Sequence, residues 1–154
     1  MAGRIFQISA SRGGVPKHAI HSAEVTSDGL TVDKQLDLRH HGGPDRALCL
    51  YTLENILALQ AEGHPIFPGS TGENITTVGI DPETLIPGAR FRLGDDVIVE
   101  ITTYAVPCRN IIESFADNDS TRISQKLHPG WSRAYVRVLE PGRIRTGDPI
   151  VHLD

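Results

Sequence analysis

Aromatic residues are scarce in this sequence of 154 residues, at 5% of the chain, so its hydrophobic core must consist mainly of Val, Ile, Leu and Ala. Basic residues are scattered, with 15 Lys and Arg against 19 Asp and Glu and a net charge of −4. Because nucleic-acid binding needs clustered cations or aromatic stacking surfaces, we expect no nucleic acid partner. No apolar stretch approaches the ~20 residues that cross a bilayer, and residues 1–8 lack the apolar region of a secretory signal. We therefore expect a cytoplasmic location and no membrane association.

Cysteine is also rare, with Cys49 and Cys108 alone in the chain. A disulfide between them is possible but not expected in a reducing compartment. Cys49 falls in the apolar segment 47–51, where we expect it to serve as packing. Cys108 follows Pro107 and precedes Arg109 at the start of a predicted short helix. A thiol in that position is expected to have a lowered pKa and more thiolate, the form that binds soft metals or carries sulfur.

The distribution of 15 Gly and 10 Pro along the chain predicts many short elements joined by turns, which favours strands over helices. We predict strands at residues 4–9, 19–26, 47–51, 73–77, 90–93, 97–103, 133–139 and 150–153, with a further short segment at 30–33 after a turn. In the first strand we expect Phe6 and Ile8 on one face, and we expect turns at residues 141–142 and 147–148. The length suits a single domain of residues 1–154. A mainly β fold, a closed or nearly closed β-barrel, would bury this many short strands without exposed edges.

One longer helix is expected at residues 53–62. Thr52 is a good N-cap, Glu54 lies in the first turn, and Gly63 follows the last turn. The segments 109–115 and 120–127 are candidates for short helices. The prediction is therefore a barrel accompanied by a few short helices.

The densest polar segment is residues 39–46. The adjacent glycines Gly42 and Gly43 allow the backbone to approach a ligand and to direct N–H groups toward an anion. Arg46 could bind a phosphate or carboxylate in a fork, while His41 could donate to an oxyanion. Asp45 could hold Arg46 in place or accept from a ligand hydroxyl. The alternative is a tight turn in which Asp45 and Arg46 form a surface pair.

A second polar loop, residues 69–74, leads into a predicted strand. Polar side chains such as Glu73 and Asn74 at the start of a strand often face a ligand. The simpler alternative is that Asn74 closes a turn and Glu73 is solvated.

Several runs of this sequence, in the same order, resemble the MOSC domain, the module named after the C-terminal part of the molybdenum cofactor sulfurases. The matching runs are residues 41–49 (HGGPDRALC), 72–74 (GEN), 107–108 (PC), 130–131 (GW), 141–144 (PGRI) and 147–150 (GDPI). The resemblance covers nearly the whole chain and is greatest to the small stand-alone bacterial members of the YiiM type. It implies a fold similar to the β-barrel domain of pyruvate kinase.

The resemblance also implies that Cys108 is the key thiol, either as a ligand of the metal in the molybdenum cofactor (molybdopterin) or as a carrier of sulfur. Cys108 is thus the expected catalytic residue and metal ligand. The residues expected to bind the pterin or phosphate part of the cofactor are Arg39, His41, Gly42, Gly43, Asp45, Arg46, Glu73, Asn74 and Arg109.

Two departures from the family pattern bear on function. Arg39 stands where close relatives are expected to carry a Lys, which keeps the charge but changes the hydrogen-bonding geometry. The chain has no room for the pyridoxal-phosphate lyase domain or the ferredoxin-like domain of large relatives, so sulfur or electrons are expected from another protein. Three functions remain open: a molybdenum-dependent oxidoreductase that reduces N-hydroxylated compounds, a sulfur carrier or cofactor-binding module without turnover, and a structural domain that binds no ligand.

Overall fold

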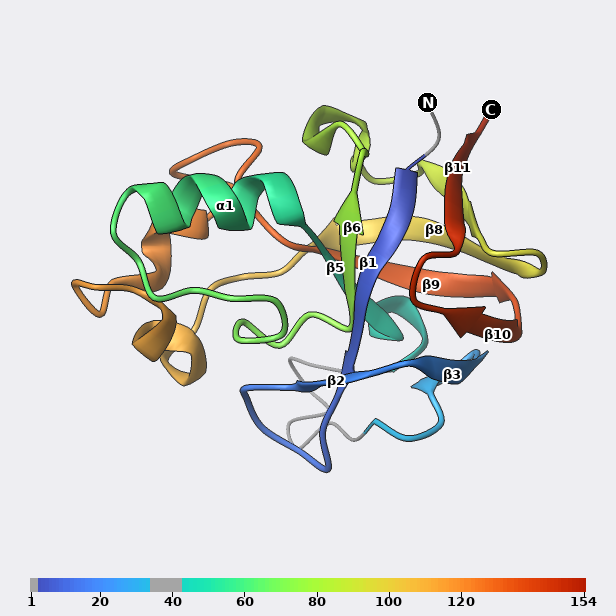
Figure 1. The fold of residues 1–154 in the computed structure, drawn as a ribbon. Coiled ribbons are helices and arrows are strands. Elements are labelled where there is room, and N and C mark those ends of the chain that lie inside the picture. The colour runs from blue at the N-terminus through green and yellow to red at the C-terminus, as the bar shows by residue number, and fades with distance from the viewer. Residues whose placement is uncertain (1–2, 34–42) are drawn as a thin grey trace.

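The structure is a computed structural model that describes residues 3–33 and 43–154, and its central feature is a closed β-barrel (Figure 1). Seven strands form the barrel in the order β11-β7-β8-β9-β5-β6-β1, and a pairing between β1 and β11 closes it. Strand β2 continues the sheet from β1, and β10, β3 and β4 form a second sheet. The predicted mainly β barrel with a few short helices is confirmed.

The described elements are mostly short. The strands are β1 (Gly3–Ala10), β2 (His18–Ile20), β3 (Ser22–Thr26), β4 (Gly29–Leu30), β5 (Leu48–Thr52), β6 (Ile75–Val78), β7 (Arg90–Leu93), β8 (Val97–Tyr104), β9 (Ala134–Glu140), β10 (Gly142–Arg145) and β11 (Pro149–Leu153). The helices are α1 (Leu53–Ala61) and the 3₁₀ helices η1 (Pro44–Arg46), η2 (Pro82–Thr84), η3 (Arg109–Ser114) and η4 (Ser120–Ile123). None of the helices in these ranges is long and apolar enough to span a bilayer.

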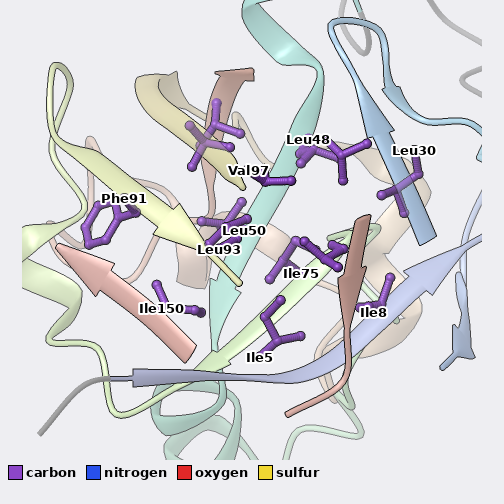
Figure 2. Close-up of a cluster of buried hydrophobic side chains, with 14 of the residues drawn as sticks. Ile5, Ile8, Leu30, Leu48, Leu50, Ile75, Phe91, Leu93, Val97 and Ile150 are labelled. Atoms are coloured by element: carbon purple, nitrogen blue, oxygen red, sulfur yellow. The ribbon is translucent and has the colours of Figure 1, made fainter. Parts of the chain in front are cut away.

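Aliphatic side chains from the strands fill the barrel (Figure 2). Leu48 and Leu50 of β5 and Ile75 of β6 meet Ile5 and Ile8 of β1 in this core, and all five are at most 1% exposed. Among the described residues of this barrel core, Phe91 is the one aromatic side chain. Burial of such side chains contributes about 1.5–3 kcal/mol each, so the barrel is a rigid support for residues at its surface.

A second, smaller core lies beside the barrel, between α1 and the two 3₁₀ helices η3 and η4. Ile56 and Leu59 of α1 pack there with Ile111 and Phe115, which lie in and directly after η3. The helix α1 begins as predicted, because the Thr52 side chain accepts a hydrogen bond from the backbone N–H of Asn55 at 3.2 Å. This second core fixes the position of the segment that begins with Cys108.

The structure corrects several details of the sequence prediction. Phe6 does not share the inward face with Ile8: a β-bulge between Ile5 and Gln7 leaves Phe6 44% exposed. The predicted strand 19–26 is divided into β2 and β3, which belong to different sheets. The predicted turn at residues 141–142 leads directly into strand β10, which pairs with β3. The two predicted short helices are 3₁₀ helices, and the second ends at Ile123.

Candidate functional site

A single cavity brings together residues from five separate segments of the chain, and we call it the Cys108 cavity. Its volume is about 90 Å³. Its lining residues are Gly14, Val15, Lys17, Arg46, Cys49, Thr71, Gly72, Asn74, Cys108, Asn110, Ile111, Arg133 and Tyr135. Three of the lining side chains are cationic, and two carry thiols. The cavity is therefore suited to an anionic ligand that can also bind to a cysteine sulfur.

Cys108 is half-buried and occupies the position before η3. Its carbonyl oxygen accepts hydrogen bonds from the Ile111 backbone N–H at 3.3 Å and from the Ser120 hydroxyl at 3.2 Å. The backbone of Cys108 is therefore held by η3 and by the start of η4, and its thiol makes no capping bond to the described part of η3. The sulfur remains available for a ligand in the cavity.

Cys49 lines the same cavity but has a different environment. It is 5% exposed and packs with Ala105 and Tyr135. Burial raises the pKa of the Cys49 thiol to about 12, with Glu73 raising it further and Arg133 and Lys17 offsetting part of the shift. Cys49 is thus a protonated thiol at neutral pH, which agrees with its predicted role as packing.

Two of the cationic residues in the cavity are almost completely buried. Lys17 is 4% exposed and Arg133 is 3% exposed. The Lys17 ammonium forms an ion pair with the Asp33 carboxylate at 2.7 Å. Arg133 instead donates to backbone oxygens: Nη1 to the Thr71 carbonyl at 2.6 Å and Nη2 to the Val106 carbonyl at 3.5 Å. The third cation, Arg46, is half-buried, with its guanidinium 5.7 Å from the centre of the Tyr135 ring.

Asn74 connects the cavity wall to the barrel and is 1% exposed. Its side-chain oxygen accepts from the Cys49 backbone N–H at 3.0 Å. Its side-chain nitrogen donates to the Asp33 carboxylate at 2.9 Å and to the Ser9 carbonyl at 3.3 Å. Asn74 therefore joins β1, β5 and the Lys17–Asp33 pair.

Glu73 lies behind the cavity wall and does not line the cavity. Its carboxylate accepts from the Gly69 backbone N–H at 3.0 Å and from the hydroxyls of Thr71 at 2.8 Å and Thr76 at 3.2 Å. Burial raises the pKa of this carboxyl group, and the hydrogen bonds and Arg133 offset part of the shift. The geometry therefore supports a role in holding the loop that presents Thr71 and Gly72, and it does not support direct contact with a cofactor.

The structure brings together some of the residues predicted from the sequence and separates others. Cys108, Arg46 and Asn74 line one cavity. Asp45 is exposed and pairs with Arg137 at 3.2 Å, so it does not hold Arg46. Other predicted residues lie elsewhere: Gly43 and Arg109 are exposed and outside the cavity lining, and Arg39, His41 and Gly42 lie outside the described residues.

Sequence reasoning missed Lys17 and Arg133. A signal existed for Arg133, because it is a charged residue at the beginning of an otherwise apolar strand segment. Such a charge is seldom buried without a partner or a ligand. Lys17 follows a Gly-Gly-Val-Pro loop, and nothing in its local sequence distinguishes it from a solvated lysine.

The donor set of the cavity decides which kind of metal group it suits. The described residues contain no group of three or more His, Cys, Asp or Glu side chains that could hold a bare metal ion. A single half-buried thiol at Cys108, which shares the cavity with cationic and amide side chains, instead fits a metal that brings its other ligands with an anionic cofactor. The residues present therefore fit a molybdenum cofactor, whose sulfur and phosphate groups carry negative charge.

Comparison with known proteins agrees with the fold and the motifs. A family model described as "MOSC domain" matches residues 37–151. The chain is 34% identical over 136 residues to the uncharacterized protein YflK of Bacillus subtilis, covering 87% of the chain and 60% of that relative. It is 30% identical over 135 residues to protein YiiM of Escherichia coli, covering 82% of the chain and 57% of YiiM. The crystal structure of E. coli YiiM superposes with a TM-score of 0.74, covering 100% of this chain and 70% of that one at 23% identity.

A third relative, from Gibberella moniliformis, is named a reductase; it is 31% identical over 119 residues, which cover 74% of the chain and 21% of that protein. The chain thus spans about three fifths of the length of the bacterial relatives and about one fifth of the fungal reductase.

Proposed function

Since this chain belongs to the MOSC domain family, we propose that it binds a molybdenum cofactor in the Cys108 cavity, with the Cys108 thiolate as the protein ligand of the metal. One observation carries the proposal: a half-buried thiol that makes no capping bond to η3 shares a cavity with three cationic side chains. The cations would neutralise the sulfur and phosphate groups of the cofactor, and the thiolate would complete the coordination of its metal.

The chain's own residues would bind and orient the cofactor. Lys17 and Arg133 are held in place by Asp33 and by the Thr71 carbonyl, so they are preorganised to receive an anion. Tyr135, Val15 and Ile111 supply apolar surface that excludes water from the thiolate. When bound, the cofactor supplies the redox chemistry that these side chains lack.

We propose reduction of N-hydroxylated compounds as the reaction, with electrons from a separate donor protein. The donor set of the cavity supports this reaction, as does a relative named as a reductase, of which this chain spans 21%.

A sulfur carrier is the second candidate, and the availability of the Cys108 thiol favours it. In this function the Cys108 thiolate attacks the outer sulfur of a persulfide on a donor protein. A new S–S bond forms at Cys108, the S–S bond of the donor breaks, and the donor cysteine leaves as a thiolate. No net oxidation or reduction takes place. Cys49 would not compete, because its thiol is protonated at neutral pH.

Metal and pterin analysis after expression in a host that makes molybdenum cofactor tests the first candidate. We expect molybdenum and pterin in the wild type, neither above background in Cys108→Ala, and both in the matched control Cys49→Ala. Absence of molybdenum and pterin from all three proteins would contradict cofactor binding. Transfer of labelled sulfur to Cys108 from a persulfide donor would then support the carrier, and an unmodified Cys108 would reject it.

A further inference from the structure

Arg133 has an unusual environment for an arginine. It is 3% exposed, lines the Cys108 cavity, and lies directly before β9. Its guanidinium carries five N–H donors. The guanidinium makes only two hydrogen bonds to described residues, both to backbone carbonyls. The second, to the Val106 carbonyl, is long at 3.5 Å. The buried Nε has no hydrogen-bond partner in the described part of the chain.

The charge of Arg133 also lacks a close counter-charge. Asp33 forms its ion pair with Lys17 on the same cavity wall, and no carboxylate lies within ion-pair distance of Arg133 among residues 3–33 and 43–154. Glu73 is near enough to interact with Arg133 through space, but its oxygens bind Gly69, Thr71 and Thr76. A buried cation without a paired anion is destabilising by several kcal/mol. An anion in the cavity would remove this penalty.

We propose that Arg133 is the principal anion-binding residue of the cavity and that its guanidinium holds a tetrahedral oxyanion. An oxyanion accepts from the planar guanidinium in a fork, a geometry that a lysine does not provide. The inference rests on the proposed function only for the source of the oxyanion, which is either the phosphate group of an organic ligand or the oxygen shell of a metal centre. The anion site itself follows from the burial and the unpartnered donor.

Calorimetric titration of the cofactor-free protein with inorganic phosphate, and separately with molybdate, tests the site. We expect binding of at least one anion by the wild type and an affinity reduced at least about tenfold in Arg133→Gln, because a charge-assisted pair is lost. Glutamine retains an N–H donor for the Thr71 carbonyl. The matched control is Arg143→Gln, at an exposed arginine of β10, with unchanged affinity. Affinity in Arg133→Gln within twofold of the wild type would overturn the proposal, as would no binding of either anion by the wild type.

An NMR measurement on the wild-type protein keeps the test valid if Arg133→Gln does not fold. The Nε–Hε signal of Arg133 is identified by its absence from the spectrum of Arg133→Lys. We expect this signal to move on titration with the anion that binds, while the Nε–Hε signal of Arg143 stays in place. A stationary Arg133 signal under saturating anion would overturn the proposal.

The two proposals fail in different ways. If the wild type contains no molybdenum but binds phosphate in an Arg133-dependent manner, cofactor binding is rejected and the anion site stands. If Cys108→Ala abolishes molybdenum binding while Arg133→Gln retains both pterin content and phosphate affinity, cofactor binding stands and the role of Arg133 is rejected.

Discussion

Replacement of Asn74 gives a test of whether the cavity wall depends on one buried amide. In Asn74→Ala, the Cys49 backbone N–H loses its acceptor at 3.0 Å and the Asp33 carboxylate loses a donor at 2.9 Å. A buried donor left without a partner costs about 1–3 kcal/mol, and a hydrogen bond to a charged group contributes about 1.5–3 kcal/mol. We therefore expect Asn74→Ala to lower the free energy of unfolding by about 2.5–6 kcal/mol.

Asn74→Asp separates the two bonds, because it keeps the oxygen that accepts from Cys49 and replaces the nitrogen that faces Asp33. Two carboxylate oxygens would then stand about 2.9 Å apart. Such a pair shares a proton, which raises its pKa above the unfolded value of about 3.9. The stability of this variant is therefore retained at low pH and lost as the pH rises through the raised pKa.

Urea unfolding at pH 5 and pH 8 measures both effects, with each variant compared with the wild type at the same pH. Asn74→Ala should show a similar loss at both values, and Asn74→Asp should show a much larger loss at pH 8. Asn110→Ala, at an exposed asparagine of the same cavity, is the matched control and should change stability by less than about 0.5 kcal/mol. If Asn74→Asp is as stable as the wild type at pH 8, Asn74 does not donate to Asp33 and the reasoning is refuted.

Three further predictions concern residues in and behind the cavity. At pH 8, iodoacetamide should label Cys108 in the native protein and Cys49 only after unfolding, because burial raises the pKa of Cys49 to about 12. Mass spectrometry that finds both cysteines labelled in the native protein would contradict this prediction. Burial raises the pKa of Glu73 above its unfolded value, so wild-type stability should fall as the pH rises through the raised pKa. In urea unfolding over a series of pH values, Glu73→Gln should gain stability relative to the wild type as the pH increases. Gly69 has φ +90°, and a Cβ added there would lie 2.5 Å from the Lys17 carbonyl oxygen. Gly69→Ala should therefore lower the free energy of unfolding by about 1–3 kcal/mol. An unchanged midpoint of thermal unfolding would contradict this prediction.

The sequence predicted those elements whose signals are local. Thr52, Glu54 and Gly63 bound α1, and the structure confirms that helix to within one residue. The hairpin of β7 and β8 was equally predictable, because alternating apolar residues flank a Gly-Asp turn. The β-bulge at Phe6 was not, since a bulge is set by pairing with β6 and leaves no mark on the alternation pattern. The division of residues 19–26 between two sheets also depends on partner strands far away in the sequence.

The candidate site was also only partly predictable, because it depends on contacts between segments that are far apart in the sequence. Cys108 follows Pro107, and Asn74 lies two residues after Gly72, each in a short polar segment of the kind that often binds ligands. The charge of Arg133 at the start of an apolar segment indicates burial but not a site. Its place beside Cys108 follows only when the barrel buries it and the second core brings Cys108 to the same cavity. A buried cation without a close carboxylate destabilises the fold when no anion is bound. Binding of an anion would remove this unfavourable free energy, and the same electrostatic cost would therefore drive binding. Tertiary structure, and not local pattern, therefore identifies the residue on which anion affinity should most strongly depend.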